Sequence, residues 1–377
     1  MNIDQIRNEL PALNQRLYFN AGTCGPLPVS VIERVKENLV EQLRYGRADS
    51  EYFERLAITR EECKSMISSM IQCQPEEISL TSSTTEGLNM VINGLDWQAG
   101  DEIITTNAEH PSGYSPLFNL RHKGIKIHFL DVIQGFDSIL DQFQQLLSSR
   151  VKLLSVSHVI YCTGDKLPAR ELANLASRHD VPVLLDGAQA FGAIALDMKS
   201  LNCDFYAAPG QKWLCGPEGT GFLYIKAQSR HRIKPVFTSY NSIKNMELYE
   251  KVEYEKDGRA FEATTLQPAA LAGMLEALRW TRSIGLEEKE KRNKALSAFA
   301  WELLKKNPNV SVINNHRPEN LISFHTKSLE SREVTLRLWQ KGIVVRPVPI
   351  TEATRISVGF YNTEEEIEQI DHCLKLW

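Results

Sequence analysis

The sequence predicts an α/β fold in which a mostly parallel β-sheet is covered by helices on both faces. Short runs rich in β-branched residues alternate with amphipathic stretches from about residue 78 to residue 225, which is the pattern of repeated strand–helix units. The chain has 377 residues, 42% of them hydrophobic and 24% charged, so it can bury a large core without disulfides or metals. In such a sheet, ligands bind beyond the carboxyl ends of the strands.

The first half of the chain carries the alternation. Amphipathic patterns at residues 29–44 and 52–71 predict two helices before the sheet begins. Short apolar, β-branched runs then predict strands at 78–82, 101–106, 125–131, 151–159, 181–187, 204–209 and 221–225. Between them, helical patterns fall at 84–95, 116–123, 140–150 and 169–180.

The pattern changes after about residue 230. The polar stretch 239–258 predicts a long loop, and a long helix is expected from Gln267 through residue 306. The rest is typical of a smaller α+β unit, with a strand at 321–326, a helix that ends at Lys341, strands at 342–348 and 354–360, and a closing helix at 363–377. We therefore expect three parts, namely an N-terminal arm that packs with the small domain, a large domain and a small C-terminal domain, at residues 1–20, 21–255 and 256–377.

Composition excludes several classes of function. The 43 basic and 47 acidic residues give a net charge of −4 without any basic block, which disfavours nucleic acid and anionic membranes as partners. Seven scattered cysteines, none at CxxC spacing, indicate reduced thiols in a cytoplasmic protein. The start MNIDQIRNEL lacks the apolar core of a signal peptide, and no HExxH motif or His/Cys cluster suggests a metal.

The segment GQKWLCGPEGTG carries the clearest chemical signal. It places Lys212 between the end of one predicted strand and a glycine-rich turn that leads into another strand. Because GPEGTG does not open a helix, it does not match a dinucleotide-binding fingerprint. Upstream, VPVLLDGAQA puts Asp186 directly after a buried strand, at the edge where ligands are expected.

Further motifs accompany these two in a familiar order. They are TSSTTEGLN, AEHPS, SHVIYCTGDKLP, RAFEATT and RISVGFYNTEEEI. With them, the chain resembles the fold-type I pyridoxal-phosphate enzymes of the class V aminotransferase family. Within that family it is similar to the branch of cysteine desulfurases, cyst(e)ine C–S lyases and isopenicillin-N-epimerase-like enzymes. The resemblance spans nearly the whole chain.

The resemblance implies pyridoxal 5'-phosphate as cofactor and assigns residues to its ring. Lys212 takes the place of the Schiff-base lysine, which also removes the substrate's α-proton. Asp186 matches the carboxylate that keeps the pyridine nitrogen protonated. Gln189 matches the donor to the phenolic oxygen, and His110 matches the imidazole that stacks on the ring.

The resemblance also implies a phosphate site that two subunits share. Thr84 and Thr85 open a predicted helix, whose N-terminus favours an anion. Gln211 replaces the usual histidine before the lysine and is expected to contribute. Thr264, in RAFEATT, matches a residue that reaches the phosphate of the neighbouring subunit, which predicts a homodimer. Pro209 stands where the family usually has a hydroxyl ligand.

For the substrate, the resemblance implies a carboxylate held by arginine. Arg355 matches the family's carboxylate-binding residue, and Arg346 matches a second arginine found in the C–S lyases. Cys162 replaces an asparagine that usually contacts substrate or ring, and we expect it to face the cofactor. Asn20 is a further candidate from an N-terminal loop.

A missing cysteine favours one reaction. Desulfurases of this family carry a nucleophilic cysteine between the two arginines, but the segment here is PVPITEAT. This disfavours persulfide transfer and favours a C–S lyase that acts by β-elimination on cysteine, cystine or a conjugate. An epimerase and a transaminase of the same family remain alternatives. A non-catalytic cofactor-binding scaffold is a remote one, because the lysine, aspartate and arginine are all present.

Overall fold

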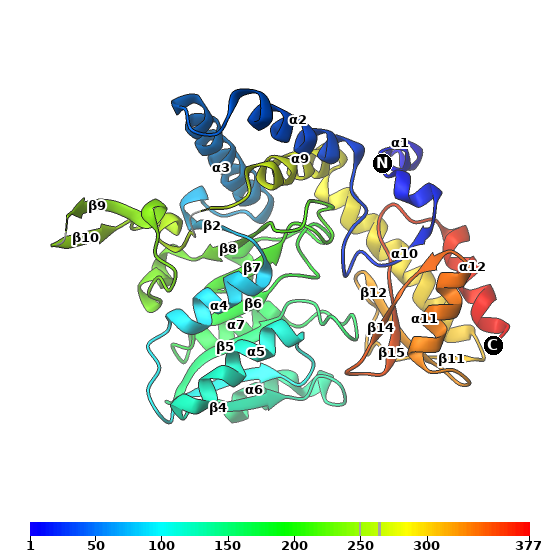
Figure 1. Cartoon of the computed structure of the whole chain (residues 1–377). Helices are drawn as coiled ribbons and strands as arrows, with labels where there is room; N and C mark the ends of the chain where they lie inside the picture. Colours follow the sequence, from blue (N-terminus) through cyan, green and yellow to red (C-terminus); the bar gives the residue numbers. More distant parts are fainter. Residues whose placement is uncertain (249, 263–264) are drawn as a thin grey trace.

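The computed structural model describes residues 1–248, 250–262 and 265–377, and a seven-stranded sheet lies at its centre (Figure 1). The strand order is β2-β8-β7-β6-β5-β3-β4. Their bounds are β2 Ile78–Thr81, β3 Glu102–Thr106, β4 Lys126–Leu130, β5 Val151–Ser157, β6 Val183–Asp186, β7 Phe205–Pro209 and β8 Gly221–Ile225. Five neighbouring strands from β7 to β4 run parallel, whereas β8 is antiparallel to both its neighbours. The predicted mostly parallel sheet is confirmed.

Helices cover both faces of this sheet because its buried strands are apolar on both sides. Successive residues Leu153 and Leu154 enter two different cores, as do Leu184 and Leu185. One core includes α4 and α5, and the other includes α3, α6 and α7. The bounds are α3 Ser50–Ile71, α4 Thr84–Gly94, α5 Pro111–Asn119, α6 Ile139–Leu146, α7 Ala169–Ser177 and the short α8 Met198–Leu201.

The predicted long helix after residue 266 is two helices. Helix α9 (Pro268–Ile284) ends at Gly285, whose φ of +90° lies in the region that favours glycine, and α10 (Leu286–Lys306) follows at once. Helix α9 packs against α2 (Val29–Tyr45) and α3, and its apolar side chains join the core of the large domain. It therefore lies with the large domain, although the predicted boundary assigned it to the small one.

The C-terminal part forms a second, smaller layer of sheet and helices. Its antiparallel sheet has the order β11-β12-β15-β14, with bounds β11 Val310–Val312, β12 Leu321–Thr326, β14 Arg346–Val348 and β15 Ala353–Ser357. Helices α10, α11 (Ser331–Gln340) and α12 (Glu364–Lys375) pack on it around a separate apolar core. This unit lies beside the large sheet (Figure 1).

The N-terminal arm contacts this C-terminal unit. Strand β1 (Leu17–Tyr18) pairs in parallel with β13 (Ile343–Val344), and Phe19 is buried in the C-terminal core. Before it, in α1 (Ile3–Asn8), Arg7 donates to a Glu366 oxygen at 2.7 Å. The arm's side chains Ile6, Leu10 and Leu13, however, join the core of the large domain, so the arm contacts both units.

The predicted long loop at 239–258 contains a hairpin instead. Strands β9 (Ile243–Glu247) and β10 (Lys251–Tyr254) pair antiparallel and project from the body (Figure 1). Most of their side chains are exposed on both faces, so the sequence shows no apolar alternation there.

Candidate active site

A cavity of about 220 Å³ lies at the carboxyl ends of the parallel strands. Because these ends meet at one edge, residues far apart in the chain line it together. Nine of the predicted site residues contribute to its lining: Thr84, Thr85, His110, Asp186, Gln189, Gln211, Lys212, Arg346 and Arg355. The arginines come from β14 and β15 of the small sheet, so the cavity lies between the two sheets.

Lys212 and Asp186 form the charged centre of the cavity. Lys212 follows β7, and burial lowers the pKa of its amine to about 8, an effect that Asp186 opposes and that Arg355 and Arg346 reinforce. Asp186 ends β6 and accepts a hydrogen bond from the Ala188 N–H at 2.8 Å. Burial raises the pKa of this carboxyl, while the nearby Lys212 favours its ionised form.

His110 is neutral at physiological pH. Burial, followed by the charges of Lys212 and the two arginines, lowers its pKa to about 4. Its Nδ1 accepts the Ser112 N–H at 3.2 Å at the start of α5, which assigns the ring proton to Nε2. The ring also meets Tyr161 edge-on at 5.0 Å between centroids. The imidazole is therefore fixed in the cavity as an uncharged flat group.

One end of the cavity is suited to an anion. Helix α4 starts there, with Ser83 as its N-cap and with Thr84 and Thr85 in its first turn. The free backbone N–H groups and the dipole of a helix start favour negative charge. Gln211 also lines the cavity, but its buried Oε1, which has no hydrogen-bond partner within the described chain, is an acceptor, so only its Nε2 could donate to an anion. A phosphate group fits this end.

The other polar end is formed by the arginine pair. Arg355 is 1% exposed; its Nη1 donates to the Tyr161 carbonyl at 2.9 Å, but its buried Nε and Nη2 have no partner among the described residues. Arg346 donates from Nη1 to the Thr23 hydroxyl at 2.8 Å. A buried guanidinium with two open donors is costly unless an anion completes it, and a carboxylate matches their geometry.

Two predicted substrate residues lie outside the cavity lining. Cys162 was expected to face the cofactor, but its buried Sγ lies 3.7 Å from the Ala108 carbonyl, and Tyr161 lines the cavity instead. Asn20 contacts the cavity lining only indirectly, because its Oδ1 accepts a hydrogen bond at 2.8 Å from the hydroxyl of Thr23, which is a lining residue. The prediction for Thr264 falls outside the described residues.

Sequence reasoning missed a buried carboxyl beneath the site. Glu109 accepts the Ser157 hydroxyl at 2.5 Å, the Ser157 N–H at 3.0 Å and the Thr106 hydroxyl at 2.7 Å. Burial raises the pKa of Glu109 to about 7, and its hydrogen bonds moderate the rise. Ser157 lines the cavity, so Glu109 ties the ends of β3 and β5 directly behind it. Its place before His110 in AEHPS was the available signal.

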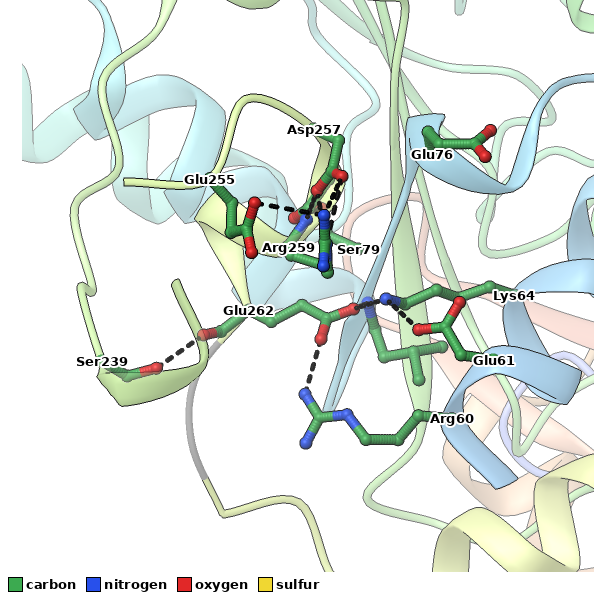
Figure 2. Close-up of polar contacts among 12 residues, drawn as sticks. Arg60, Glu61, Lys64, Glu76, Ser79, Ser239, Glu255, Asp257, Arg259 and Glu262 are labelled. Carbon is green, nitrogen blue, oxygen red and sulfur yellow. Dashed lines mark hydrogen bonds and ion pairs between the residues drawn. The ribbon is translucent and has the colours of Figure 1, made fainter. Parts of the chain in front are cut away.

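A buried cluster of charged residues anchors the segment that ends at Glu262. Glu262 is 2% exposed and accepts from Arg60 at 2.5 Å, while its other oxygen lies 3.0 Å from the Lys64 ammonium (Figure 2). The Leu80 N–H of β2 donates to the same carboxylate at 3.1 Å. The segment up to Glu262 is thus fixed to α3 and to the edge of the large sheet.

The comparisons with known proteins agree with this arrangement. The sequence model of the aminotransferase class-V family matches residues 16–370, so the chain belongs to that family. A probable cysteine desulfurase of Methanothermobacter thermautotrophicus is 25% identical over all of this chain and 98% of its own length. A cysteine desulfurase of Cronobacter sakazakii is 28% identical over 98% of this chain and 96% of its own.

Solved structures extend the similarity to the whole fold. The cystine C–S lyase C-DES, in complex with its reaction product cysteine persulfide, is 28% identical with a TM-score of 0.92, covering 97% of this chain and 99% of its own. A C-DES variant with glycine covalently linked to the PLP cofactor is also 28% identical, with a TM-score of 0.93 over 98% of both chains. The predicted fold-type I class and its cofactor, pyridoxal 5'-phosphate, are confirmed.

Within residues 1–248, 250–262 and 265–377, no group of three or more His, Cys, Asp or Glu side chains is placed to hold a metal ion. In the same part of the chain, no helix is long and apolar enough to cross a membrane.

Proposed function

We propose that this enzyme is a C–S lyase that cleaves cystine, cysteine or a cysteine conjugate by β-elimination. The observation that carries the proposal is the buried guanidinium of Arg355, whose Nε and Nη2 have no partner among the described residues and which lines the same cavity as Lys212. It supports an α-amino acid as substrate, because the carboxylate would occupy the arginine while the α-carbon lies toward the lysine.

The short link between the two arginines supports elimination over persulfide transfer. Arg346 and Arg355 lie opposite one another in the hairpin of β14 and β15, and only four residues separate the two strands. None of these residues is a cysteine. The similarity to C-DES, whose reaction product is cysteine persulfide, favours cystine as a substrate.

The cofactor, when bound, would supply the electron sink that stabilises negative charge at the substrate's α-carbon. Lys212 would hold it covalently, Asp186 would keep its ring nitrogen protonated, and the neutral ring of His110 would lie against it. The start of α4 with Thr84 would receive the phosphate end, and Gln211 could contribute only as a donor, from its Nε2. Gln189 already donates to the Gly22 carbonyl at 2.9 Å and accepts from the Trp213 indole, so its amide is held in a fixed orientation.

The lysine would then act as the base. The lowered pKa of Lys212, about 8, leaves a useful fraction of neutral amine near neutral pH, which is what proton abstraction requires. Arg355 would hold the carboxylate, so that the α-proton faces the amine. Loss of the thiolate or persulfide from the β-carbon, followed by hydrolysis, would give pyruvate and ammonia.

The test is pyruvate release from L-cystine by the cofactor-loaded protein, with Lys212→Ala as the blank. We expect steady pyruvate, with cysteine persulfide as the sulfur product, and none from the variant. Pyruvate absent from a protein that carries the cofactor would refute the lyase. Alanine instead of pyruvate would indicate a desulfurase, a racemised amino acid an epimerase, and a keto acid with the aminated cofactor a transaminase.

The proposed assembly is a homodimer in the cytoplasm. The predicted role of Thr264 places this residue at the phosphate of a second subunit, and Glu262 fixes the segment that precedes it. Exposed apolar side chains, among them Leu43 and Tyr45 on α2 and Phe53 on α3, support a surface that contacts a second subunit. Analytical ultracentrifugation of the holoenzyme tests the dimer, and a monomer at micromolar concentration would refute it.

A further inference from the structure

Lys289 is a buried cation that the proposed reaction does not use. It lies in the first turns of α10, is fully buried, and burial lowers the pKa of its amine to about 8. Among the described residues, no carboxylate pairs with it. Its Nζ instead contacts the Trp213 carbonyl at 3.2 Å, the Thr281 hydroxyl at 3.2 Å and the face of the Phe360 ring at 4.4 Å.

Such a group is unfavourable for the fold alone. Removing an ammonium from water costs several kcal/mol, and a hydrophobic side chain of similar volume is often as stable or more so. Carbonyl, hydroxyl and ring contacts recover only part of that cost. A role beyond stability accounts for its presence.

The carbonyl that Lys289 holds belongs to the turn that carries Lys212. This turn is tight, because the Cys215 N–H donates to the Lys212 carbonyl at 3.0 Å and Cys215 has a φ of +61°, an uncommon value for a residue with a side chain. Gly192 also packs on this turn, since a Cβ there would come within 2.8 Å of the Trp213 carbonyl carbon. The peptide that joins Trp213 to Leu214 thus contacts both Gly192 and the ammonium.

The same contact reaches two other cavity residues. The indole N–H of Trp213 donates to Gln189 Oε1 at 3.0 Å, and Gln189 Nε2 donates to the Gly22 carbonyl. A Cβ on Gly22 would lie 2.8 Å from Arg355 Nη2, so this glycine packs directly against the arginine. One network therefore joins the Lys212 turn to the carboxylate end of the cavity.

We propose that Lys289 is a positioning residue that fixes the Lys212 turn, and through Trp213 the amide of Gln189, in the geometry that binds the cofactor. The inference rests on the proposed role of Lys212. It predicts that removing the ammonium lowers the affinity for the cofactor without lowering the stability of the fold.

The test uses Lys289→Met, which removes the ammonium at similar volume, and Lys289→Gln, which keeps a donor for the Trp213 carbonyl. The matched control is Lys294→Met on the same helix, where the lysine is half exposed and paired with Glu290. Cofactor affinity is measured by titrating cofactor-free protein and following visible absorbance. Thermal unfolding is measured on the same cofactor-free proteins.

We expect Lys289→Met to bind the cofactor about ten-fold more weakly, which is the loss of one charged hydrogen bond. We expect Lys289→Gln to bind the cofactor with an affinity within about three-fold of the wild type. Lys289→Met, Lys289→Gln and Lys294→Met should all unfold at or above the wild-type unfolding temperature. Amide exchange at Cys215 should accelerate in Lys289→Met, while exchange along α10 stays unchanged. Unchanged cofactor affinity, or a Lys289→Met protein that is broadly destabilised or fails to fold, would overturn the proposal.

Borohydride reduction of the wild-type holoenzyme separates this inference from the proposed function. Peptide mapping should find the reduced cofactor on Lys212. Labelling elsewhere would refute the role of Lys212, and with it the premise for Lys289. Labelling on Lys212 with unchanged affinity in Lys289→Met would refute only the positioning role.

Discussion

Replacing Arg355 with lysine tests how the cavity holds a substrate carboxylate. The wild-type side chain keeps one nitrogen on the Tyr161 carbonyl and leaves two buried donors open. A carboxylate can take both, and each charge-assisted hydrogen bond contributes about 1.5–3 kcal/mol. A lysine offers a single point of contact, so Arg355→Lys should lose about 2 kcal/mol, or about 30-fold in kcat/KM.

The assay is pyruvate release from L-cystine across a range of substrate concentrations. Because the carboxylate contact is made before and during the reaction, most of the loss should appear as a raised KM. Arg346→Lys is the matched control; its nitrogen already bonds the Thr23 hydroxyl, so a smaller loss is expected. An Arg355→Lys enzyme within about three-fold of wild-type kcat/KM would refute the assignment of this guanidinium to the substrate.

Three other predictions follow from buried contacts. Because the pKa of Glu109 is raised from 4.5 to about 7, the folded protein holds this proton more tightly and loses stability as pH rises through that window. In urea titrations, Glu109→Gln should therefore gain about 3 kcal/mol relative to wild type between pH 4 and pH 8; a pH-independent difference would contradict this. Glu262→Gln leaves Arg60 without its carboxylate and Lys64 with only the exposed Glu61 as partner. It should lower the free energy of unfolding by about 3 kcal/mol, and a loss below about 1 kcal/mol would count against that cluster. Gly22→Ala would place a methyl group 2.8 Å from Arg355 Nη2 and should raise KM for L-cystine with little change in kcat; an unchanged KM would mean that the arginine moves freely.

The fold could be predicted where burial leaves a periodic trace in the sequence. Apart from the edge strand β4, whose residues are mostly half-buried or exposed, the strands of the large sheet are buried on both faces, and each strand lies at or within a residue or two of its expected range. The hairpin of β9 and β10 was missed because most of its side chains face water on both sides. The break between α9 and α10 rests on Gly285 alone, and an isolated glycine in a helical pattern is a weak signal.

The candidate site was predicted largely through the family resemblance, which carries fixed spacings between distant motifs. Residue patterns alone could not say which of two adjacent side chains faces a cavity, and so Cys162 was chosen where Tyr161 lines the wall. Glu109 and Lys289 were missed for a related reason. Each is an ordinary charged residue in the sequence, and only the packing around it shows that water is excluded.

The N-terminal arm has a consequence for how this protein is made. Arg7 donates to the Tyr361 carbonyl, a partner 354 residues later in the chain, and Gly22 and Thr23, which directly follow the arm, line the cavity. The ribosome therefore makes Arg7 and Thr23 at least 323 residues before their partners Tyr361 and Arg346. Until β14 and β15 leave the ribosome, the nascent chain can assemble its large sheet around Lys212 while the end of the cavity that binds the carboxylate is still incomplete. The chain can thus bind the cofactor before it can bind the substrate.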